Sequence, residues 1–378
     1  MIKYNNRTGC IVICKKKKST NNTLLGSTDC NISEELCNKP IKIDLEHSYG
    51  PAQYINVSLQ TDDNTYTKSE LLLFDSANPM LIYPYYEHLK GLKAYNIIAG
   101  TLANPIYEPW GCPVFRIKGP IILPYKGNNS EYIIENCEFV ACYDGPKDNP
   151  KASRTSNFGS SYVSPSWEIG GPIKPPFRYS IYNKSEQHPP CNYLEISYNR
   201  KANSYINIYS ENPPIYPMIS ILSDLAIMSS EIKGLTINTK SYSNWVNRPN
   251  KWNITYGEED TGGGLILIND PKGYIDRTSL GKGISPPGIA SYGTYCEVFN
   301  ANFTINLDGI ILNIPKSEDF PQSINDNNSN TVICQHSNYT TAINIGGISF
   351  YYYDALIDYR DKNKGGFKIG FKGKLNYK

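Results

Sequence analysis

The stretch that decides the predicted fold lies near the C-terminus, and apolar and aromatic residues dominate it. It reads Ile345-Gly346-Gly347-Ile348-Ser349-Phe350-Tyr351-Tyr352-Tyr353-Asp354-Ala355-Leu356-Ile357-Asp358, followed by Lys364-Gly365-Gly366-Phe367-Lys368-Ile369-Gly370-Phe371. Tyrosine and other aromatic or β-branched residues favour strands, whereas glycine favours turns. This composition is typical of short strands separated by tight turns.

The same pattern continues outward from this stretch towards the N-terminus. From about Tyr54, short alternating or continuous apolar segments are bounded by Gly, Pro, Asn or Asp; they cover 55–59, 70–74, 80–83, 121–124, 132–134 and 139–141. Such segments indicate half-buried or buried strands. Helical periodicity is scarce and no internal sequence repeat is visible, so we predict an all-β protein.

Composition and charge limit the possible classes of function. The 378 residues include 37 basic and 35 acidic side chains, and 40% of residues are hydrophobic. This near-neutral balance argues against a nucleic-acid binder held by phosphate contacts. The hydrophobic share is large enough for a folded core. The 31 tyrosines and 40 asparagines favour strands and turns.

Cysteines and glycosylation sequons point to an oxidising compartment. The ten cysteines form no repeated Cys-x-x-Cys pair, and only four histidines are present, so we expect disulfides and no metal site or cofactor. Ten Asn-x-Ser/Thr sequons are predicted to carry glycans: Asn6, Asn21, Asn31, Asn56, Asn128, Asn183, Asn253, Asn302, Asn327 and Asn338. We therefore predict a secreted or cell-surface glycoprotein.

Neither a leader nor a membrane anchor is recognisable in the sequence. The N-terminus shows no apolar stretch of about 7–15 residues, as a signal peptide requires. No run approaches about 18 apolar residues, so no transmembrane segment is predicted. The first 40 residues hold four cysteines and the run Lys15–Lys18. We interpret them as a Cys-rich N-terminal extension.

The C-terminal stretch closely resembles the signature of pepsin-like aspartic proteases. In that family an apolar–Gly–Asp turn begins a short helix, a strand ends in Phe-Asp, and a final strand reads Ile/Val-Gly-Phe. Residues 345–358 resemble the turn, the helix and the first of these strands without a gap, and residues 369–371 read Ile-Gly-Phe. The resemblance covers about residues 50–371. It implies a bilobal pepsin-like double β-barrel, here with an N-terminal lobe at 41–250 and a shortened C-terminal lobe at 251–378.

The resemblance also places candidate site residues in the first lobe. Asp75, in Leu73-Phe74-Asp75-Ser76-Ala77-Asn78, falls where the family has its first catalytic Asp-Thr-Gly. The segment 137–145 resembles the flap hairpin, with Tyr143 as the flap tyrosine. Cys296 and Cys334 are the only two cysteines of the predicted second lobe, so we expect them to form a disulfide.

Catalysis in this family needs two carboxylates, one from each lobe. Two like charges so close cannot both ionise, so the pair holds one proton and works as acid and base on a water. Each aspartate begins a turn whose glycine allows close backbone approach and whose last hydroxyl bonds the carboxylate. In the first turn the glycine has become Ala77 and the hydroxyl has become Asn78.

The second carboxylate is not found where the family pattern leads us to expect it. The motif should follow the strand predicted at 309–314, but 316–330 contains no apolar–apolar–Asp-Thr/Ser-Gly sequence. The segment Gly262-Gly263-Gly264-Leu265-Ile266-Leu267-Ile268 resembles only the strand that opens the second lobe. We therefore expect a pseudoenzyme, in which Asp75 is a vestigial turn residue and Tyr143 an ordinary hairpin tyrosine.

Three functions remain open after this reasoning. The first is a secreted, glycosylated, non-catalytic binding protein, such as an inhibitor or recognition protein for a protein or glycan ligand. The second is a structural or adhesive coat glycoprotein that assembles with itself, because Tyr is favoured at packed interfaces. The third is an active aspartic endopeptidase with an unrecognised second aspartate. The first is favoured because relatives in the resembled family set that precedent.

Overall fold

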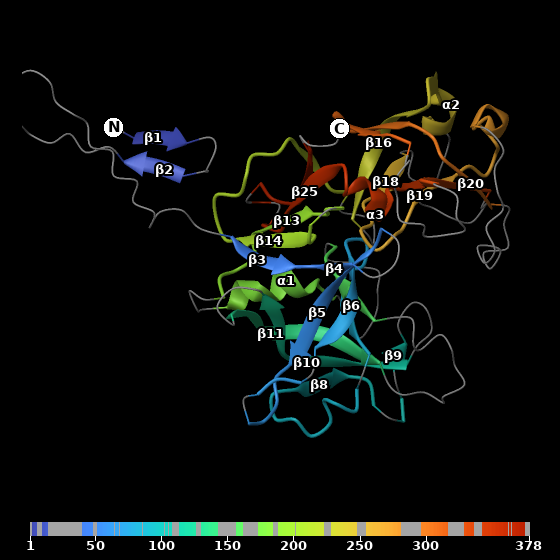
Figure 1. Ribbon diagram of the computed structural model, residues 1–378. Helices are drawn as coiled ribbons and strands as arrows, with labels where there is room; N and C mark the ends of the chain where they lie inside the picture. The colour runs from blue at the N-terminus through green and yellow to red at the C-terminus, as the bar shows by residue number, and fades with distance from the viewer. Residues whose placement is uncertain are drawn as a thin grey trace, which may run out of the picture.

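The protein is all-β and bilobal, as predicted, in a computed structural model of the chain (Figure 1). The structure describes residues 2–5, 10–13, 40–47, 51–63, 65–67, 69–84, 86–101, 103–104, 106–107, 113–125, 130–142, 156–161, 173–183, 188–200, 202–222, 228–247, 255–280, 296–316, 329–335, 342–361, 363 and 365–374. These residues form four sheets and a few single-turn helices.

The first lobe is built on a nine-stranded sheet from the first half of the chain. Its strands run in the order β4-β5-β6-β12-β7-β11-β10-β8, and β9 pairs with β10. They are β4 (Glu46–His47), β5 (Gln53–Leu59), β6 (Glu70–Asp75), β7 (Leu81–Tyr83), β8 (Asn96–Ala99), β9 (Ile106–Tyr107), β10 (Pro113–Tyr125), β11 (Ser130–Cys142) and β12 (Asn157–Gly159).

The second lobe has a nine-stranded sheet of its own. The strand order is β20-β23-β19-β24-β18-β16-β21-β22, and β17 pairs with β16. The strands are β16 (Ser229–Ile237), β17 (Lys240–Ser241), β18 (Tyr256–Glu258), β19 (Ile266–Asn269), β20 (Cys296–Phe299), β21 (Phe303–Leu307), β22 (Ile310–Ile314), β23 (Thr331–Cys334) and β24 (Ile343–Asn344).

The two lobes repeat one topology. In the first, β5-β6-β12-β7-β11-β10 are joined by pairings that alternate antiparallel, parallel, antiparallel, parallel and antiparallel. In the second, β16-β18-β24-β19-β23-β20 follow the same alternation. Equivalent strands therefore place equivalent residues at the junction of the lobes.

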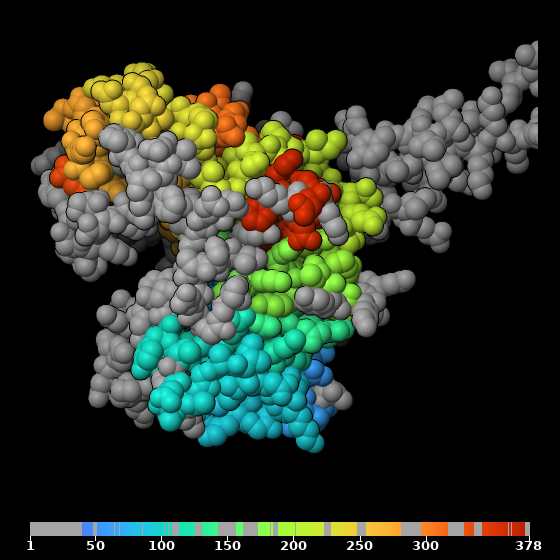
Figure 2. Space-filling view, turned by 180° about the vertical axis from the view of Figure 1, so that it is seen from behind, coloured from blue at the N-terminus to red at the C-terminus, as the bar shows by residue number. Residues whose placement is uncertain are grey.

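A six-stranded sheet lies between the lobes and joins segments from three parts of the chain (Figure 1). Its order is β15-β26-β25-β13-β14-β3, formed by β3 (Ile41–Asp44), β13 (Tyr193–Ser197), β14 (Tyr205–Tyr209), β15 (Met218–Ser220), β25 (Tyr353–Asp358) and β26 (Lys368–Gly373). In the space-filling view, the first lobe (blue to green) lies below and the second (yellow to orange) above, with green and red segments of this sheet between them (Figure 2).

This topology corrects the predicted lobe boundary. The second-lobe sheet already begins with β16 at Ser229, before the predicted boundary at 250/251. The last strands, β25 and β26, join the sheet between the lobes instead of the second-lobe sheet. In the predicted N-terminal extension, β1 (Ile2–Asn5) and β2 (Cys10–Ile13) form a two-stranded sheet with each other, and no other described strand joins it.

Helices are short and serve as turns between strands. They are α1 (Pro176–Tyr179), η3 (Ser180–Tyr182), α2 (Ser243–Val246), η4 (Arg277–Leu280) and α3 (Gly346–Ser349). Gly346, which begins α3, has a φ of +68°, and a Cβ there would lie 2.3 Å from the Leu265 carbonyl oxygen. Only glycine fits this position. No helix of the described residues is long and apolar enough to cross a membrane.

Tyrosines fill much of the core. Among the described residues thirteen tyrosines are buried, and Tyr83, Tyr132, Tyr198 and Tyr359 have no exposed surface. Residues on β11 alternate between two cores: Phe139 and Ala141 enter the main one, while Val140 packs on the other face with Met80 and Ile82. Core packing therefore accounts for a part of the tyrosine excess, and this weakens its use as an argument for self-assembly.

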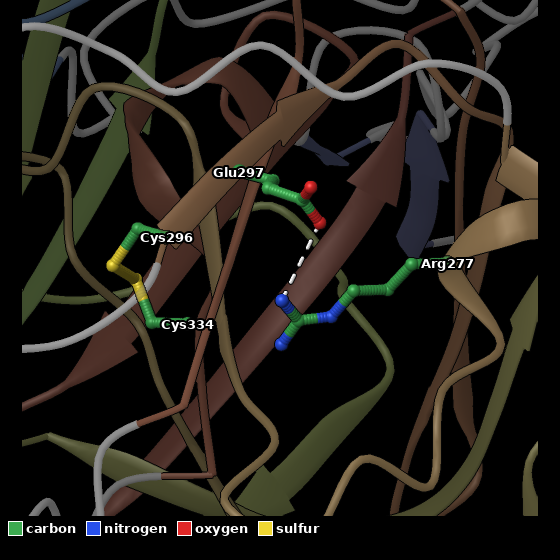
Figure 3. Close-up of a disulfide and its surroundings, with 4 residues drawn as sticks. All are labelled: Arg277, Cys296, Glu297 and Cys334. Carbon is green, nitrogen blue, oxygen red and sulfur yellow. Dashed lines mark hydrogen bonds and ion pairs between the residues drawn. A yellow bond between two sulfur atoms is a disulfide. The ribbon is translucent and has the colours of Figure 1, made fainter.

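The predicted disulfide between Cys296 and Cys334 is confirmed (Figure 3). The two cysteines face each other on β20 and β23, with their Cα atoms 4.2 Å apart. Glu297, the next residue, pairs with Arg277 of η4 at 3.4 Å between Nη1 and Oε2. The two cysteines are 38 residues apart in sequence, so the bridge keeps this loop closed in the unfolded chain, whereas reduction would open it.

Replacing both cysteines of this bridge by serine is expected to lower the free energy of unfolding by about 2–4 kcal/mol, because the unfolded chain regains the entropy that the closed loop removes. Urea denaturation of the variant and the parent under non-reducing conditions measures the difference. Identical midpoints would contradict a stabilising role for the bridge.

Candidate functional site

Asp75 ends strand β6 at the junction of the two lobes. The strand is apolar up to Phe74, and β6 is flanked by β5 and β12, so the position of the aspartate is fixed on both sides. Its Oδ1 accepts hydrogen bonds from the backbone N–H groups of Ala77 (2.8 Å) and Asn78 (3.2 Å). The turn 75–78 thus orients the half-buried carboxyl group through its own backbone.

Asp260 occupies the equivalent place in the second lobe. It follows β18 by two residues, and its Oδ1 accepts a hydrogen bond from the Gly263 N–H at 2.8 Å, as Oδ1 of Asp75 does from Asn78. The sequence Asp260-Thr261-Gly262-Gly263 then leads into β19. Like Asp75, Asp260 is half-buried.

The two carboxyl groups face each other closely enough to interact. Burial first, and then the charge of Asp260, raise the pKa of Asp75 to about 8, with a side-chain hydrogen bond between the two aspartates as a further cause. The Asn157 amide and the Ala77 N–H act in the opposite direction. Two carboxyl groups in such contact hold one proton between them over a wide pH range.

A glycine allows this close approach. A Cβ placed on Gly262 would lie 2.7 Å from Cγ of Asp75, nearer than any real Cβ comes to another atom. Any other residue at 262 would therefore push the two turns apart. Ala77, in the other turn, has no positive φ, so its methyl group is accommodated without backbone strain.

Reciprocal hydrogen bonds lock the two turns together. The Ser76 N–H donates to Oγ1 of Thr261 (2.8 Å), and the Thr261 N–H donates to Oγ of Ser76 (2.9 Å). Each hydroxyl then donates across the junction, Ser76 to the Glu259 carbonyl (2.5 Å) and Thr261 to the Phe74 carbonyl (3.1 Å). All four partners are buried, so the bonds are shielded from water.

Two asparagines complete the contacts of the carboxyl pair. Nδ2 of Asn157, on β12, donates to Oδ2 of Asp75 at 2.7 Å. Nδ2 of Asn344, on β24, donates to Oδ2 of Asp260 at 2.5 Å. Each aspartate therefore receives backbone N–H groups on Oδ1 and a side-chain amide on Oδ2.

A third acidic side chain lies directly beside the site. Glu259 precedes Asp260, has no exposed surface and donates its N–H to the Met228 carbonyl at 3.1 Å. Burial raises the pKa of its carboxyl to about 8, and the Ser230 hydroxyl opposes this only in part. The side chain is therefore neutral at acidic pH, and charging it is costly.

A tyrosine lies buried next to the pair. The hydroxyl of Tyr198 donates to the Thr261 carbonyl at 3.4 Å, and burial raises its pKa well above the ordinary value, with smaller contributions from Tyr351, Asp260 and Asp75. Tyr351, whose ring is 5.4 Å from that of Tyr198, accepts a hydrogen bond from Nε2 of Gln53 at 2.7 Å. These contacts tie the second turn to the sheet between the lobes.

The prediction that no second carboxylate faces Asp75 is wrong. The resemblance places the second motif after residue 309, but the second-lobe sheet begins at Ser229, so its aspartate comes early, as Asp75 does in the first lobe. The apolar residues expected before the motif are replaced by Gly257, Glu258 and Glu259. The triplet Asp260-Thr261-Gly262 was the signal that could have identified the site.

The prediction that residues 137–145 form a flap hairpin is corrected for residues 137–142, which the structure describes. Residues 137–142 are the end of strand β11, paired with β10 and β7, and form no hairpin turn; β11 pairs with β10 from Ser130, opposite Tyr125, to Cys142. Tyr143 itself lies outside the described residues.

The predicted glycosylation sites divide into three groups. Asn6, Asn21, Asn31, Asn128, Asn253, Asn327 and Asn338 lie outside the described residues. Asn302 is exposed, and Asn56 is half-buried with its Nδ2 donating to Glu46 at 2.5 Å. Asn183 is buried and its Nδ2 donates to the Ile133 carbonyl at 2.7 Å, so a glycan there would displace this hydrogen bond.

The site can move a proton but offers no group of metal ligands. Among the described residues no cluster of three or more His, Cys, Asp or Glu could hold a metal ion. The chemistry available is that of two facing carboxyl groups with one shared proton, which can act as a general acid and a general base on one substrate. The sequence matches no protein-family model and no curated protein.

Proposed function

We propose that the protein is an aspartic endopeptidase of the pepsin-like type, whose catalytic pair is Asp75 and Asp260. The observation that carries the proposal is the contact of these two carboxyl groups across the repeated topology, where Gly262 lets the second turn approach Asp75. Burial first, and then the charge of Asp260, raise the pKa of Asp75 to about 8. This is the third of the functions left open by the sequence. It replaces the binding protein as the favoured one, because that choice depended on a missing second carboxylate.

The mechanism follows from one proton held by two carboxyl groups. The ionised carboxylate takes a proton from a water molecule, which attacks the peptide carbonyl carbon, while the protonated partner donates to the carbonyl oxygen. When the tetrahedral intermediate collapses, the C–N bond breaks and a proton passes to the leaving amine. The hydrogen bonds of Ser76 and Thr261 hold both aspartates in position during these transfers.

The departures from the family pattern do not remove a necessary group. Ala77 still donates its N–H to Asp75 at 2.8 Å, and it adopts no positive φ. The hydroxyl that the family places last in each turn is replaced by Asn78 and Gly263, but each carboxyl group receives an amide donor from another strand. Both carboxyl groups therefore keep a backbone donor on Oδ1 and a side-chain donor on Oδ2.

An assay of peptide-bond cleavage tests the proposal. The full chain should cleave an unfolded protein such as casein at pH 4–6 and lose this activity above about pH 8, where the pair gives up its proton. Pepstatin, which imitates the tetrahedral intermediate, should block cleavage, and Asp75→Asn should abolish it. Absence of pepstatin-sensitive cleavage at every pH between about 3 and 8 would overturn the proposal and return a binding function to first place.

The proposal also includes an extracellular or secretory-pathway location. The disulfide between Cys296 and Cys334 and the exposed sequon at Asn302 support it. Expression in a secreting eukaryotic cell, followed by glycosidase treatment and mass spectrometry, tests this part. Glycan at Asn302 is the expected result, and an unmodified Asn302 in secreted protein would count against it.

A further inference from the structure

The asparagines Asn157 and Asn344 occupy equivalent positions in the two lobes. In the parallel pairing of β12 with β6, Asn157 lies opposite Leu73, two residues before Asp75. In the parallel pairing of β24 with β18, Asn344 lies opposite Glu258, two residues before Asp260. Both amides therefore reach their aspartate by the same route, from a neighbouring strand and not from the aspartate's own turn.

The turns themselves provide no side-chain donor for Oδ2. Oδ1 of Asn78 accepts from the Met80 N–H at 3.0 Å, its buried Nδ2 makes no hydrogen bond among the described residues, and Gly263 has no side chain. Among the described residues, the hydrogen bonds that reach the two Oδ2 atoms from side-chain nitrogen are those of Asn157 (2.7 Å) and Asn344 (2.5 Å).

The orientation of the Asn344 amide is fixed by a second contact. Its Oδ1 accepts a hydrogen bond from the Gly346 N–H at 2.9 Å, so its Nδ2 must point towards Asp260. Asn157 is buried, and its amide faces Oδ2 of Asp75. An ionised carboxylate oxygen accepts a hydrogen bond but cannot provide one, so the amide must turn its Nδ2 towards it. Both amides therefore present N–H groups to the carboxyl pair.

An amide differs from a hydroxyl in a way that matters here. A hydroxyl can donate to a carboxylate or accept from a protonated carboxyl group, so it tolerates both states. The nitrogen of an amide only donates, and hydrogen bonds to the charged form favour that form. A pair of amides therefore disfavours protonation at either Oδ2.

We infer that Asn157 and Asn344 are positioning residues whose amide N–H groups favour the charged form of the carboxyl pair, and so set the pH range over which the pair holds a single proton. This inference rests on the proposed function of the pair, but it concerns two residues outside both catalytic turns. It identifies the pair of amides as the replacement for the hydroxyl groups that Asn78 and Gly263 lack.

The variants Asn157→Leu and Asn344→Leu test the inference, because leucine has a similar size and no donor. A lost hydrogen bond to a charged group should move the acidic limb of the pH profile of kcat/KM upward by roughly one pH unit for each variant. A purely structural role would lower kcat/KM equally at every pH. Asn330→Leu is the control: Asn330 is fully buried, and its Nδ2 donates to the carbonyls of Ala301 (2.7 Å) and Pro315 (3.0 Å), away from the pair.

A second measurement separates this inference from the proposed function. Carbon-13 NMR of labelled aspartate carboxyl groups, assigned with Asp75→Asn and Asp260→Asn, follows the pair's titration whether or not the protein cleaves peptides. An upward shift in the leucine variants of a chain without protease activity would support the inference and reject the protease. Unmoved titration and unmoved limbs in folded leucine variants would overturn the inference, even if the parent is an active protease.

Discussion

Asp260→Asn is expected to reduce kcat/KM for acid cleavage of a peptide substrate by at least about 10³-fold. Asparagine has the same shape and keeps an oxygen for the Gly263 N–H, which now bonds Oδ1 of Asp260 at 2.8 Å. It cannot take a proton from water, so the general acid–base step, worth about 10²–10⁴-fold in rate, is lost. The pKa of Asp75 should also fall, because the charge of Asp260 is one of the causes that raise it.

The control for this variant is another aspartate of the second lobe. Asp276 is exposed and pairs with Lys240 at 3.1 Å, away from the carboxyl pair. Asp276→Asn should retain activity within about twofold, since surface substitutions rarely change stability by more than about 0.5 kcal/mol. If Asp260→Asn is folded and cleaves as fast as Asp276→Asn, Asp260 is not part of the catalytic pair.

Glu259→Gln is expected to make the protein more stable at alkaline pH without changing its stability in acid. The pKa of the buried carboxyl is raised from 4.5 to about 8 on folding, so the folded state binds the proton more tightly than the unfolded state does. Stability from this group is therefore complete below pH 4.5 and is lost as the pH rises towards 8. At 1.36 kcal/mol for each pKa unit, the loss approaches about 5 kcal/mol, which the neutral glutamine avoids.

Urea denaturation at pH 4 and pH 8.5 measures this effect as a difference between parent and variant. The raised pKa of Asp75 acts in the same direction in both proteins and cancels from the comparison. Glu87→Gln is the control, because Glu87 is exposed and lies in a surface ion pair with Lys90. Equal pH dependence in the parent and Glu259→Gln would show that Glu259 carries its charge in the folded protein.

The features that the sequence predicted correctly are those that depend on local pattern or on few alternatives. Short apolar segments between Gly, Pro, Asn and Asp predicted the all-β class, and β6 delivers Asp75 where the strand–turn pattern placed it. The disulfide partners were limited to Cys296 and Cys334 once a second lobe was assumed. The Tyr-rich C-terminal stretch forms α3 and the central strand β25.

The features that the sequence did not reveal depend on symmetry between distant segments. The two lobes share strand order, but equivalent residues differ: Phe74 corresponds to Glu259, and Asn78 to Gly263. Because the shared roles are carried largely by backbone groups, the side chains were free to diverge and no sequence repeat remains. Asn157 and Asn344 lie on strands of three and two residues, too short to produce a periodic pattern.

The sheet between the lobes has a consequence for the order of folding. Its strands β13 and β14 pair with each other, but the sheet is completed only after β25, near residue 355, has been synthesised and pairs with β13. The Gln53–Tyr351 hydrogen bond likewise spans 298 residues. Contacts over such distances form slowly. During translation, the first lobe with Asp75 would therefore emerge from the ribosome well before the second lobe with Asp260 is in place. The nascent chain would hold no complete carboxyl pair until its last strands have been synthesised.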